Sequence, residues 1–185
     1  SIGRINESIN YFEKAIFNQE DNYAAMNNLA NSYRNIYEFK KSEDLYKNVI
    51  KKDPKNIKSL NNYSNLKRKL NNYRDAKTLL LKGLTIDESN VTILTNLVVC
   101  CQGLGEMTDA KNYAYKILEI DPLNTSAHKL LSSIVNYSKE PDHFDKMKEL
   151  LSEENLNNFS SSEKVHLFFA IGKAYEDIKD YENSY

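Results

Sequence analysis

Few residues in this chain could do chemistry, and their spacing does not assemble a catalytic site. His128, His143 and His166 are the only histidines, and they are scattered without the spacing of metal ligands. Cys100 and Cys101 are the only cysteines, and because neighbouring cysteines rarely bridge, we expect buried, reduced thiols. The sequence has no glycine-rich phosphate loop, nucleophile elbow or carboxylate pair with a partner base. We therefore predict no catalytic residue, no metal and no cofactor, and we expect His128 to be a core residue.

The side chains that recur at a fixed interval are amides. Asn28, Asn62 and Asn96 are each 34 residues apart and stand near apolar neighbours. An Asn amide places a donor and an acceptor side by side, so it can bond both the C=O and the N–H of an extended peptide. A row of such amides would hold a polypeptide by its main chain. The alternative is an ordinary solvated face, since asparagine makes up 24 of the 185 residues.

The composition is that of a globular protein, with 41% apolar and 28% charged residues. The 5 glycines and 3 prolines favour helix over many tight turns. No apolar run approaches the roughly 18 residues of a membrane span, and no signal peptide is visible, so we expect a cytoplasmic protein without a membrane partner. Residues 1–74 carry 14 basic against 8 acidic residues, and residues 75–185 carry 11 against 18. This asymmetry is too weak for a nucleic-acid surface, but it could favour different partners at the two ends.

A repeat determines the expected fold. Units of 34 residues begin at Tyr23, Ile57, Val91 and Thr125. Within each regular unit, positions 4, 7, 8 and 11 and again positions 20, 24 and 27 carry mostly apolar or small residues at the spacing of amphipathic helices. Each unit is therefore predicted to form two helices joined by a short turn. The last position of each unit is predicted to cap the following helix, and it is occupied by Asn22, Asn56, Asn90 and Asn124.

The chain is expected to contain several such units in series. Residues 1–22 form the second helix of an incomplete repeat, 23–124 three regular repeats, 125–164 an irregular repeat, and 165–185 the start of a further repeat. Because the chain starts and stops inside predicted helices, we expect it to be a piece of a longer protein.

The period breaks after the third regular repeat. There we predict a first helix over 125–138, a second over about 142–152 and a polar loop near 153–161. The last first helix starts near Ser162, and its predicted core positions are Phe168, Ile171, Gly172 and Tyr175.

The pattern resembles the tetratricopeptide repeat, whose motif has a large residue at position 4, Tyr at 11, Ala at 20 and 27, and Pro at 32. The closest stretch reads NLANSYRNIYEFKKSEDLYKNVIKKDPKN. The resemblance implies an all-α, right-handed superhelical solenoid of antiparallel helix pairs. The departures are Lys67 and Cys101 at position 11 and Gly83 at position 27. Lys67 is expected to bury its stem and lift its charge to water.

In this family the first helices line a concave groove. The resemblance therefore implies a non-catalytic protein–protein interaction scaffold that binds an extended peptide or protein segment, without nucleic acid or a small-molecule ligand. The carboxylate clamp of chaperone-binding members is expected to be absent, because Thr92 and Asn96 replace its basic residues. RNA-binding pentatricopeptide proteins fit less well, since their unit is one residue longer and their surface is basic. The predicted groove residues are Asn28, Asn31, Asn35, Lys58, Asn62, Asn65, Lys69 and Asn96, with Arg34 and Arg68 adding positive charge that suits an acidic segment.

The C-terminal stretch suggests an alternative function. Residues 167–185 read LFFAIGKAYEDIKDYENSY, which resembles the segment before the catalytic domain of bacterial repeat-containing sulfotransferases. The resemblance implies a substrate-recruiting region of a larger sulfotransferase or similar transferase whose catalytic domain is not in this chain. Both ends of the repeat array are also expected to expose apolar faces, which predicts self-association.

Overall fold

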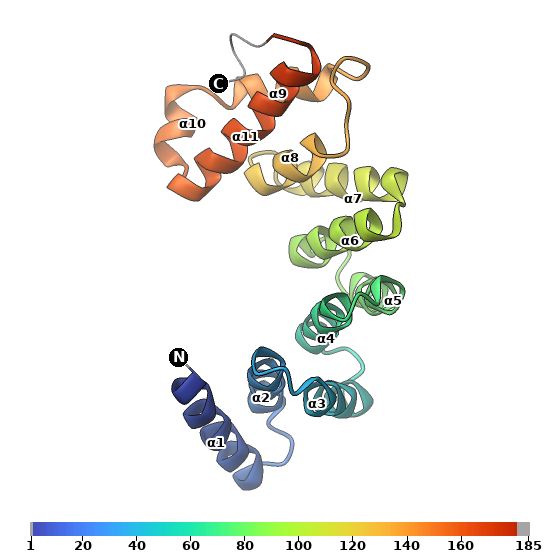
Figure 1. Ribbon diagram of the computed structural model, residues 1–185, viewed down its shortest axis with the longest axis vertical. Coiled ribbons are helices and arrows are strands. Elements are labelled where there is room, and N and C mark those ends of the chain that lie inside the picture. The colour runs from blue at the N-terminus through green and yellow to red at the C-terminus, as the bar shows by residue number, and fades with distance from the viewer. Residues whose placement is uncertain (1, 181–185) are drawn as a thin grey trace. The chain divides into compact units, whose positions relative to one another are not determined.

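The computed structural model describes residues 2–180, which form eleven helices and no strand (Figure 1). The chain divides into two compact units, Ser1–Asn96 and Leu97–Tyr185. The predicted all-α fold of successive helix pairs is confirmed.

The first unit consists of helix pairs in series. Helix α2 packs against α3, α4 packs against α5, and α2 also contacts α4, so that two first helices lie side by side. Helix α1 packs on α2, and α3 packs on α4. The helices of this unit are α1 (Ile2–Asn18), α2 (Tyr23–Asn35), α3 (Phe39–Lys52), α4 (Ile57–Lys69), α5 (Tyr73–Leu84) and the first part of α6 (Val91–Leu104).

Asparagine caps set where the first helices begin. Helices α2, α4, α6 and α8 start at the first positions of the 34-residue units. In each case the preceding asparagine accepts a hydrogen bond from a backbone N–H in the first turn, at 2.9–3.0 Å. Each such cap contributes about 1 kcal/mol by satisfying an otherwise unpaired helix donor. The capping residues are Asn22, Asn56, Asn90 and Asn124, as predicted.

The turns between paired helices also repeat. Tyr37, Asn71 and Gly105, all at position 15 of their units, have positive φ angles of 66°, 57° and 75°. This left-handed conformation closes the first helix through a backbone bond back to the residue three positions earlier. Lys179 has the same conformation, with φ 63°, after the last helix. Position 15 of a unit that begins at Val165 would fall on this residue.

Small residues let the paired helices approach closely. Ser42 on α3 donates a 2.7 Å hydrogen bond to the carbonyl of Ala30 on α2, and both residues are buried. Ala30 also belongs to a core cluster with Tyr46, Tyr63 and Leu66, which joins one helix pair to the next. The rings of Tyr46 and Tyr63 stack with centroids 5.9 Å apart. Packing between nearest neighbours therefore holds the regular repeats together.

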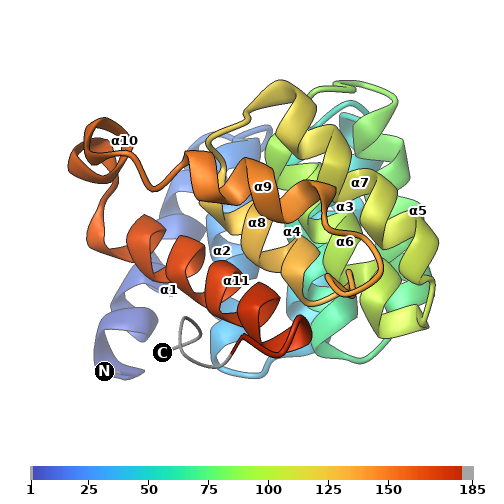
Figure 2. The ribbon, with the colours of Figure 1, turned by 90° about the horizontal axis from the view of Figure 1, so that it is seen from above.

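The second unit is built around α8. Helix α8 packs against α7 and α11, and α11 also contacts α9; Figure 2 shows α9 and α11 alongside α8. The helices here are the end of α6, α7 (Met107–Ile120), α8 (Thr125–Ser132), α9 (Asp142–Glu149), α10 (Glu153–Asn158) and α11 (Ser161–Asp177).

The predicted helix over 125–138 ends early, at Ser132. The chain leaves the helix so that Tyr137 can enter the core, where its side chain is 1% exposed. Its N–H donates to Asp177 at 3.2 Å, and its hydroxyl contacts His143 at 2.7 Å. Tertiary hydrogen bonds thus override the helical period.

The predicted second helix over 142–152 and the polar loop near 153–161 are also corrected. Helix α9 ends at Glu149, and the loop contains α10. Ser152 caps α10 by accepting from the N–H of Asn155, and Glu153 and Glu154 lie in its first turn, where acidic residues are favoured.

Helix α11 buries one side and leaves the other uncovered. Ile171 is buried as predicted, but Phe168 is 50% exposed, and Gly172 and Tyr175 are partly exposed. The ring of Tyr175 packs edge-on against Phe144, with centroids 4.9 Å apart. The expected core role therefore fails for Phe168.

Candidate peptide-binding surface

All ten residues predicted to bind a peptide lie in the first unit, on its first helices. Four are on α2, five on α4 and one on α6, and α2 and α4 pack side by side. Asn35, Lys58 and Lys69 are exposed, and the other seven are partly buried. They lie on neighbouring helices, and their role in binding stays a prediction. This set of residues, called the amide surface below, comprises Asn28, Asn31, Arg34, Asn35, Lys58, Asn62, Asn65, Arg68, Lys69 and Asn96.

Several amides of this surface already have partners in the protein. Asn96 Nδ2 donates to Asn61 Oδ1 at 2.7 Å, which links α6 to α4. Asn31 Oδ1 accepts from the Tyr46 hydroxyl at 2.8 Å. Each of these bonds uses one group of the amide and leaves the other pointing elsewhere. Some amide groups of this surface are therefore bonded within the protein, and others are open to a ligand.

Asn27 makes the other amide link between first helices. Its Nδ2 donates to Ser59 Oγ at 2.8 Å, so α2 is tied to α4 through buried polar groups. Ser59 also contacts the Asn56 cap at 2.9 Å. Sequence reasoning missed Asn27 and Asn61 because they precede the predicted ladder by one position. The Asn-Asn doublets at 27–28 and 61–62 were the available signal.

Asn62 stands out because its Nδ2 atom is buried without a hydrogen-bond partner. Such a donor destabilises the fold by about 1–3 kcal/mol relative to a satisfied one. The comparable donor on Asn96 is satisfied by Asn61, whereas Asn27 is bonded to Ser59 and does not serve Asn62. As placed, the Nδ2 of Asn62 can reach a ligand only after the side chain rotates.

The amide surface is positively charged. Within the part of the chain that the structure describes, its four basic side chains make no ion pair with a carboxylate. The ammonium of Lys69 lies 4.5 Å from the ring centroid of Tyr37 and 5.5 Å from that of Phe39. Arg68 donates to Asn65 at 3.2 Å. These cations thus stay available to an acidic partner.

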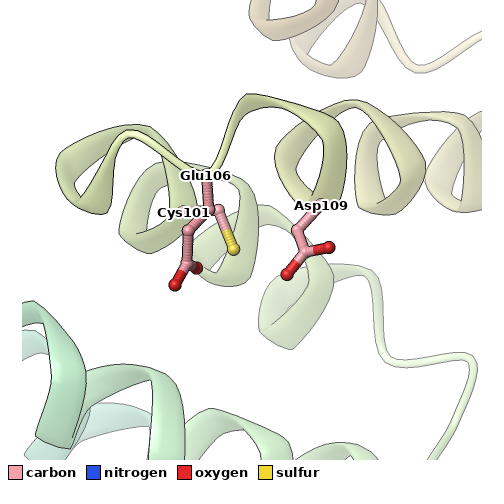
Figure 3. A group of neighbouring side chains, drawn as sticks. All are labelled: Cys101, Glu106 and Asp109. Carbon is pink, nitrogen blue, oxygen red and sulfur yellow. The ribbon is translucent and has the colours of Figure 1, made fainter.

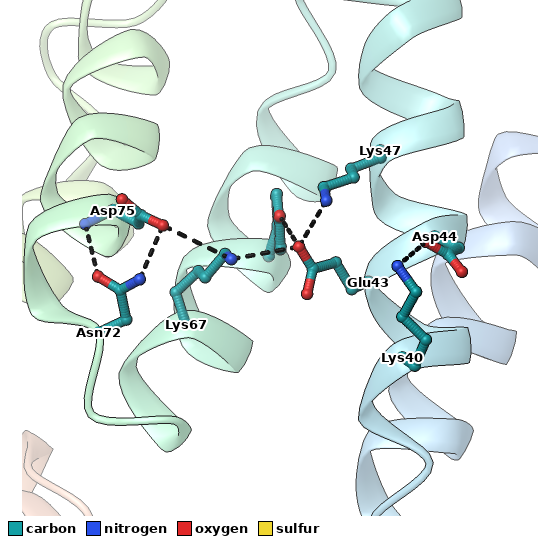
Figure 4. Close-up of polar contacts among 8 residues, drawn as sticks. Lys40, Glu43, Asp44, Lys47, Lys67, Asn72 and Asp75 are labelled. Atoms are coloured by element: carbon teal, nitrogen blue, oxygen red, sulfur yellow. Dashed lines mark hydrogen bonds and ion pairs between the residues drawn. The ribbon is translucent and has the colours of Figure 1, made fainter.

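A separate ion cluster next to this surface is structural. Glu43 accepts from Lys47 at 2.7 Å, from the Tyr63 hydroxyl at 2.7 Å and from Lys67 at 3.2 Å (Figure 4). The hydrogen bond from Lys47 is the largest cause that lowers the pKa of Glu43 to about 2. Lys67 also pairs with Asp75 at 3.5 Å, and its side chain is 15% exposed. The expectation that Lys67 lifts its charge to water is therefore wrong, because ion pairs hold the ammonium between helices.

The second unit holds a buried row of side chains that are linked by hydrogen bonds. His128 Nδ1 lies 2.8 Å from His143 Nε2, and His143 Nδ1 lies 2.7 Å from the Tyr137 hydroxyl. The Nε2 of His128 lies 3.0 Å from the carbonyl of Pro122, which has only acceptor capacity. That nitrogen must donate, so His128 Nδ1 accepts from His143, which in turn accepts from Tyr137. Both imidazoles are then neutral.

Burial also keeps the imidazoles of His128 and His143 neutral. It lowers the pKa of His128 and, together with the neighbouring His128, lowers that of His143 to about 3. His128 is confirmed as a core residue, but the histidines are not all scattered, since the fold joins His128 to His143. Both are almost fully buried, so the arrangement is suited to structure rather than to contact with a substrate.

One group of possible metal ligands lies at the corner between α6 and α7. The Cys101 thiol and the carboxylates of Glu106 and Asp109 lie within 4.8 Å of one another (Figure 3). All three residues make interactions within the protein. Cys101 is also completely buried, and a thiol must lose its proton to bind a metal. We assign no metal to this group.

The helix pairs, the capped 34-residue period and the repeated turns define a tetratricopeptide-type helical repeat protein. Within that class, the model of the coatomer epsilon subunit family matches residues 8–152, and the chain belongs to this family. A search of the curated proteins gave no match. No described helix is both long and apolar enough to cross a bilayer.

Solved structures of repeat proteins share the fold at low sequence identity. PilF of Pseudomonas aeruginosa has a TM-score of 0.76 at 16% identity, over 98% of this chain and 80% of its own. YrrB, described as a TPR protein with an unusual peptide-binding site, has a TM-score of 0.68 at 17% identity, over 94% and 86%. MamA of Desulfovibrio magneticus RS-1 has a TM-score of 0.68 at 13% identity, over 85% and 89%.

The resemblance to sulfotransferases is not supported by these comparisons. The family match ends at residue 152 and so leaves out the stretch that carries the resemblance. Residues 181–185 of that stretch lie outside the described residues. The transferase alternative thus depends on the sequence resemblance alone.

Proposed function

We propose that this chain is a non-catalytic interaction module that binds an extended, acidic segment of another protein on the amide surface. The observation that carries the proposal is the combination of amide side chains on two adjacent first helices with four basic side chains that make no ion pair among the described residues. Amides can bond a peptide main chain, and the cations select acidic side chains. The family name describes a subunit of an assembly, and the name of YrrB describes a peptide-binding protein. Both support a role in protein binding.

The amides differ in what they can offer a ligand. Asn28 and Asn35 contribute no side-chain hydrogen bond within the described residues, so both of their amide groups are available. Asn31 keeps its NH₂ group, because Tyr46 occupies only its oxygen. Asn96 is already bonded to Asn61 and is the least available. Binding should therefore depend most on the amides of α2.

The proposal is tested by titrating the chain with a fluorescein-labelled 12-residue peptide of alternating Asp and Ser, in comparison with a Lys-Ser peptide. We expect selective binding of the acidic peptide. Replacing Asn28 and Asn35 together with Ala should weaken it about thirtyfold, since each lost hydrogen bond is worth about 1 kcal/mol. Asn48→Ala, on the exposed side of α3, is the matched control.

Charge is tested separately from the amides. Arg34→Glu with Lys58→Glu should abolish the preference for the acidic peptide, whereas Lys55→Glu outside the amide surface should leave most of it. Equal binding of both peptides, or unchanged affinity of the Asn28/Asn35 variant with an intact circular dichroism spectrum, would reject the amide surface as the binding site.

A further inference from the structure

The buried row of hydrogen-bonded side chains also connects the helices of the second unit. It runs from Tyr137 in the loop after α8, through His143 on α9 and His128 on α8, to the carbonyl of Pro122 in the turn before α8. Among the described residues, His143 makes the only side-chain hydrogen bonds from α9 to another element. The backbone N–H of Tyr137 also donates to Asp177 on α11, at 3.2 Å. Breaking the row would therefore remove every described side-chain hydrogen bond that holds α9 in place.

The hydrogen bonds of the row leave no place for additional protons. All four ring nitrogens of the two histidines are used within the row, and none of them contacts a carboxylate. A proton added to His128 would reverse the bonds to His143 and Tyr137, and would leave the Tyr137 hydroxyl proton without an acceptor in the row. A second proton, on His143, would set two N–H donors against each other across 2.8 Å. The closed row therefore excludes protons that both imidazoles bind readily in water.

The surroundings of the row also oppose a positive charge. Burial is the largest cause that lowers the pKa of His128, and it lowers the pKa of His143 to about 3. The ammonium of Lys146 on α9 acts in the same direction on both imidazoles, whereas Asp121 favours a charge on His128 by less than burial opposes it. From α7, the ring of Tyr115 packs edge-on against His143, with centroids 6.2 Å apart.

The remaining acidic groups near the row are paired or exposed. Glu140 in the loop makes an ion pair with Lys111 on α7. Asp177 is paired with Lys173 within α11, at 2.6 Å. Asp142, at the start of α9, is exposed. No carboxylate among the described residues is therefore placed to stabilise a charged imidazole in the closed row.

The first unit contains no comparable group. All three histidines of the sequence lie in the second unit. In the first unit the pKa of Glu43 is lowered to about 2 by its hydrogen bond from Lys47, so this carboxylate affects stability only below its ordinary value of 4.5. The proton uptake by histidine that accompanies unfolding between pH 7 and pH 5 is therefore confined to the second unit.

We propose that the row is an acid-sensitive switch: as the pH falls from 7 to 5, His128 and His143 take up protons, the row breaks, and α9 separates from α8 while the first unit stays folded. At neutral pH the buried side chains of α9, Phe144 and Met147, keep the unit closed, because opening exposes them to water. Acid would thus change the surface of the second unit. It would leave the amide surface, which lies within residues 1–96, as it is.

The size of the effect follows from the number of protons taken up. In the open state an imidazole binds a proton with its ordinary pKa of about 6.5. One imidazole that the closed row keeps neutral raises the equilibrium constant for opening about 25-fold between pH 7 and pH 5, and two raise it about 600-fold. We therefore expect opening to increase at least about 25-fold over this range.

Amide hydrogen exchange of the 185-residue chain, followed by mass spectrometry at pH 7, 6 and 5, tests the proposal. Each rate is divided by the intrinsic rate of the same amide at that pH, so that the quotient reports the opening equilibrium. For peptides that cover α9, we expect this quotient to rise about 25-fold or more from pH 7 to pH 5. For peptides from α2 and α4, in the first unit, it should not change.

Two variants show whether the histidines of the row are responsible. His128→Gln with His143→Gln should remove the pH dependence of exchange in α9, whereas His166→Gln, outside the row, should keep it. Tyr137→Phe retains both imidazoles, so it should raise exchange at pH 7 and keep most of the pH dependence.

Two results from the wild-type chain would overturn the proposal, and neither requires a variant to fold. One is exchange in α9 that changes no more with pH than exchange in α2, and the other is an equal rise in both units, which indicates global unfolding. A double histidine variant that is folded by circular dichroism and keeps the full pH dependence would overturn it as well. Acidic-peptide binding to α2 and α4 is measured separately at pH 7, so either proposal can fail alone.

Discussion

The amide of Asn96 on α6 donates to the amide oxygen of Asn61 on α4, at 2.7 Å. The two residues are 35 apart in sequence, so this single bond joins the first helices of consecutive repeats. Asn27 and Ser59 join the preceding pair of first helices by a different pair of groups. Some of the recurring asparagines thus form hydrogen bonds within the protein, and only the others can bind a partner.

The bond between Asn96 and Asn61 should contribute measurably to stability. In a double-mutant cycle with Asn61→Ala and Asn96→Ala, we expect a coupling energy of about 1 kcal/mol, the usual worth of a neutral hydrogen bond. Urea unfolding monitored by circular dichroism supplies the four stabilities. Asn35→Ala, at an exposed position, should change stability by less than about 0.5 kcal/mol. Additive effects of Asn61→Ala and Asn96→Ala would contradict the bond.

Asn62 should behave in the opposite way. Its Nδ2 is buried and unpaired, so Asn62→Leu removes a desolvated donor and adds apolar contact at similar volume. We expect unfolding to become harder by up to about 1 kcal/mol, whereas Asn96→Leu should make it easier because it leaves Asn61 without its donor. Thermal melts of the two variants, run side by side, give the sign of each change in stability. A loss of stability in Asn62→Leu would show that its amide is satisfied in solution.

The regular repeats could be predicted because local signals and packing agree there. The Asn56 and Asn90 caps begin their helices where the apolar period begins, and the left-handed turn residue follows at position 15 each time. The 34-residue period could not predict which amide bonds to which group. Asn27 and Asn28 are neighbours and differ only in the side of the helix to which they point. Side-chain pairing between helices depends on contacts that no spacing within one helix encodes.

The irregular unit was predicted less well for a physical reason. Tyr137 and His143 look like ordinary helix residues in the sequence, but their mutual bond draws the chain out of α8 before residue 138. The polar stretch after Leu151 looked like a loop, although Ser152 caps a short helix. Phe168 was placed in the core because its position in the repeat is normally covered, whereas among the described residues its side chain is 50% exposed.

A methyl group at Gly83 should bring less than the usual gain in helix stability, because it would meet a buried neighbour. Ala usually stabilises a helix interior by about 1 kcal/mol relative to Gly. A Cβ at Gly83, however, would lie 3.0 Å from the Cδ1 of Ile93, which is completely buried. We expect Gly83→Ala to change stability little, and to gain about 1 kcal/mol when Ile93→Val removes that methyl group. Chemical denaturation of the single and double variants measures this, and a full gain in Gly83→Ala alone would contradict the clash.

The buried histidines make stability depend on pH in a defined direction. The pKa of His143 is lowered to about 3, chiefly by burial, from an ordinary value of 6.5. The unfolded chain therefore takes up a proton below pH 6.5 that the folded chain refuses. Stability is complete above pH 6.5 and falls as the pH drops from 6.5 toward 3. The carboxylate of Glu43, with a pKa of about 2, contributes a loss only below its ordinary value of 4.5.

Between pH 7 and pH 5 we therefore expect the free energy of unfolding to fall by about 2 kcal/mol, because 1.5 pH units below the ordinary value correspond to that amount. His143→Gln removes the titrating group and should flatten most of this dependence, although it also lowers stability at pH 7 by breaking the bonds to Tyr137 and His128. His166→Gln, at a partly exposed position, is the matched control and should keep the slope. Urea titrations at four pH values give the slope of the free energy of unfolding against pH for each variant. A wild-type slope equal to that of His143→Gln would mean that this imidazole is protonated in the folded protein, contrary to the neutral chain from Tyr137 to Pro122.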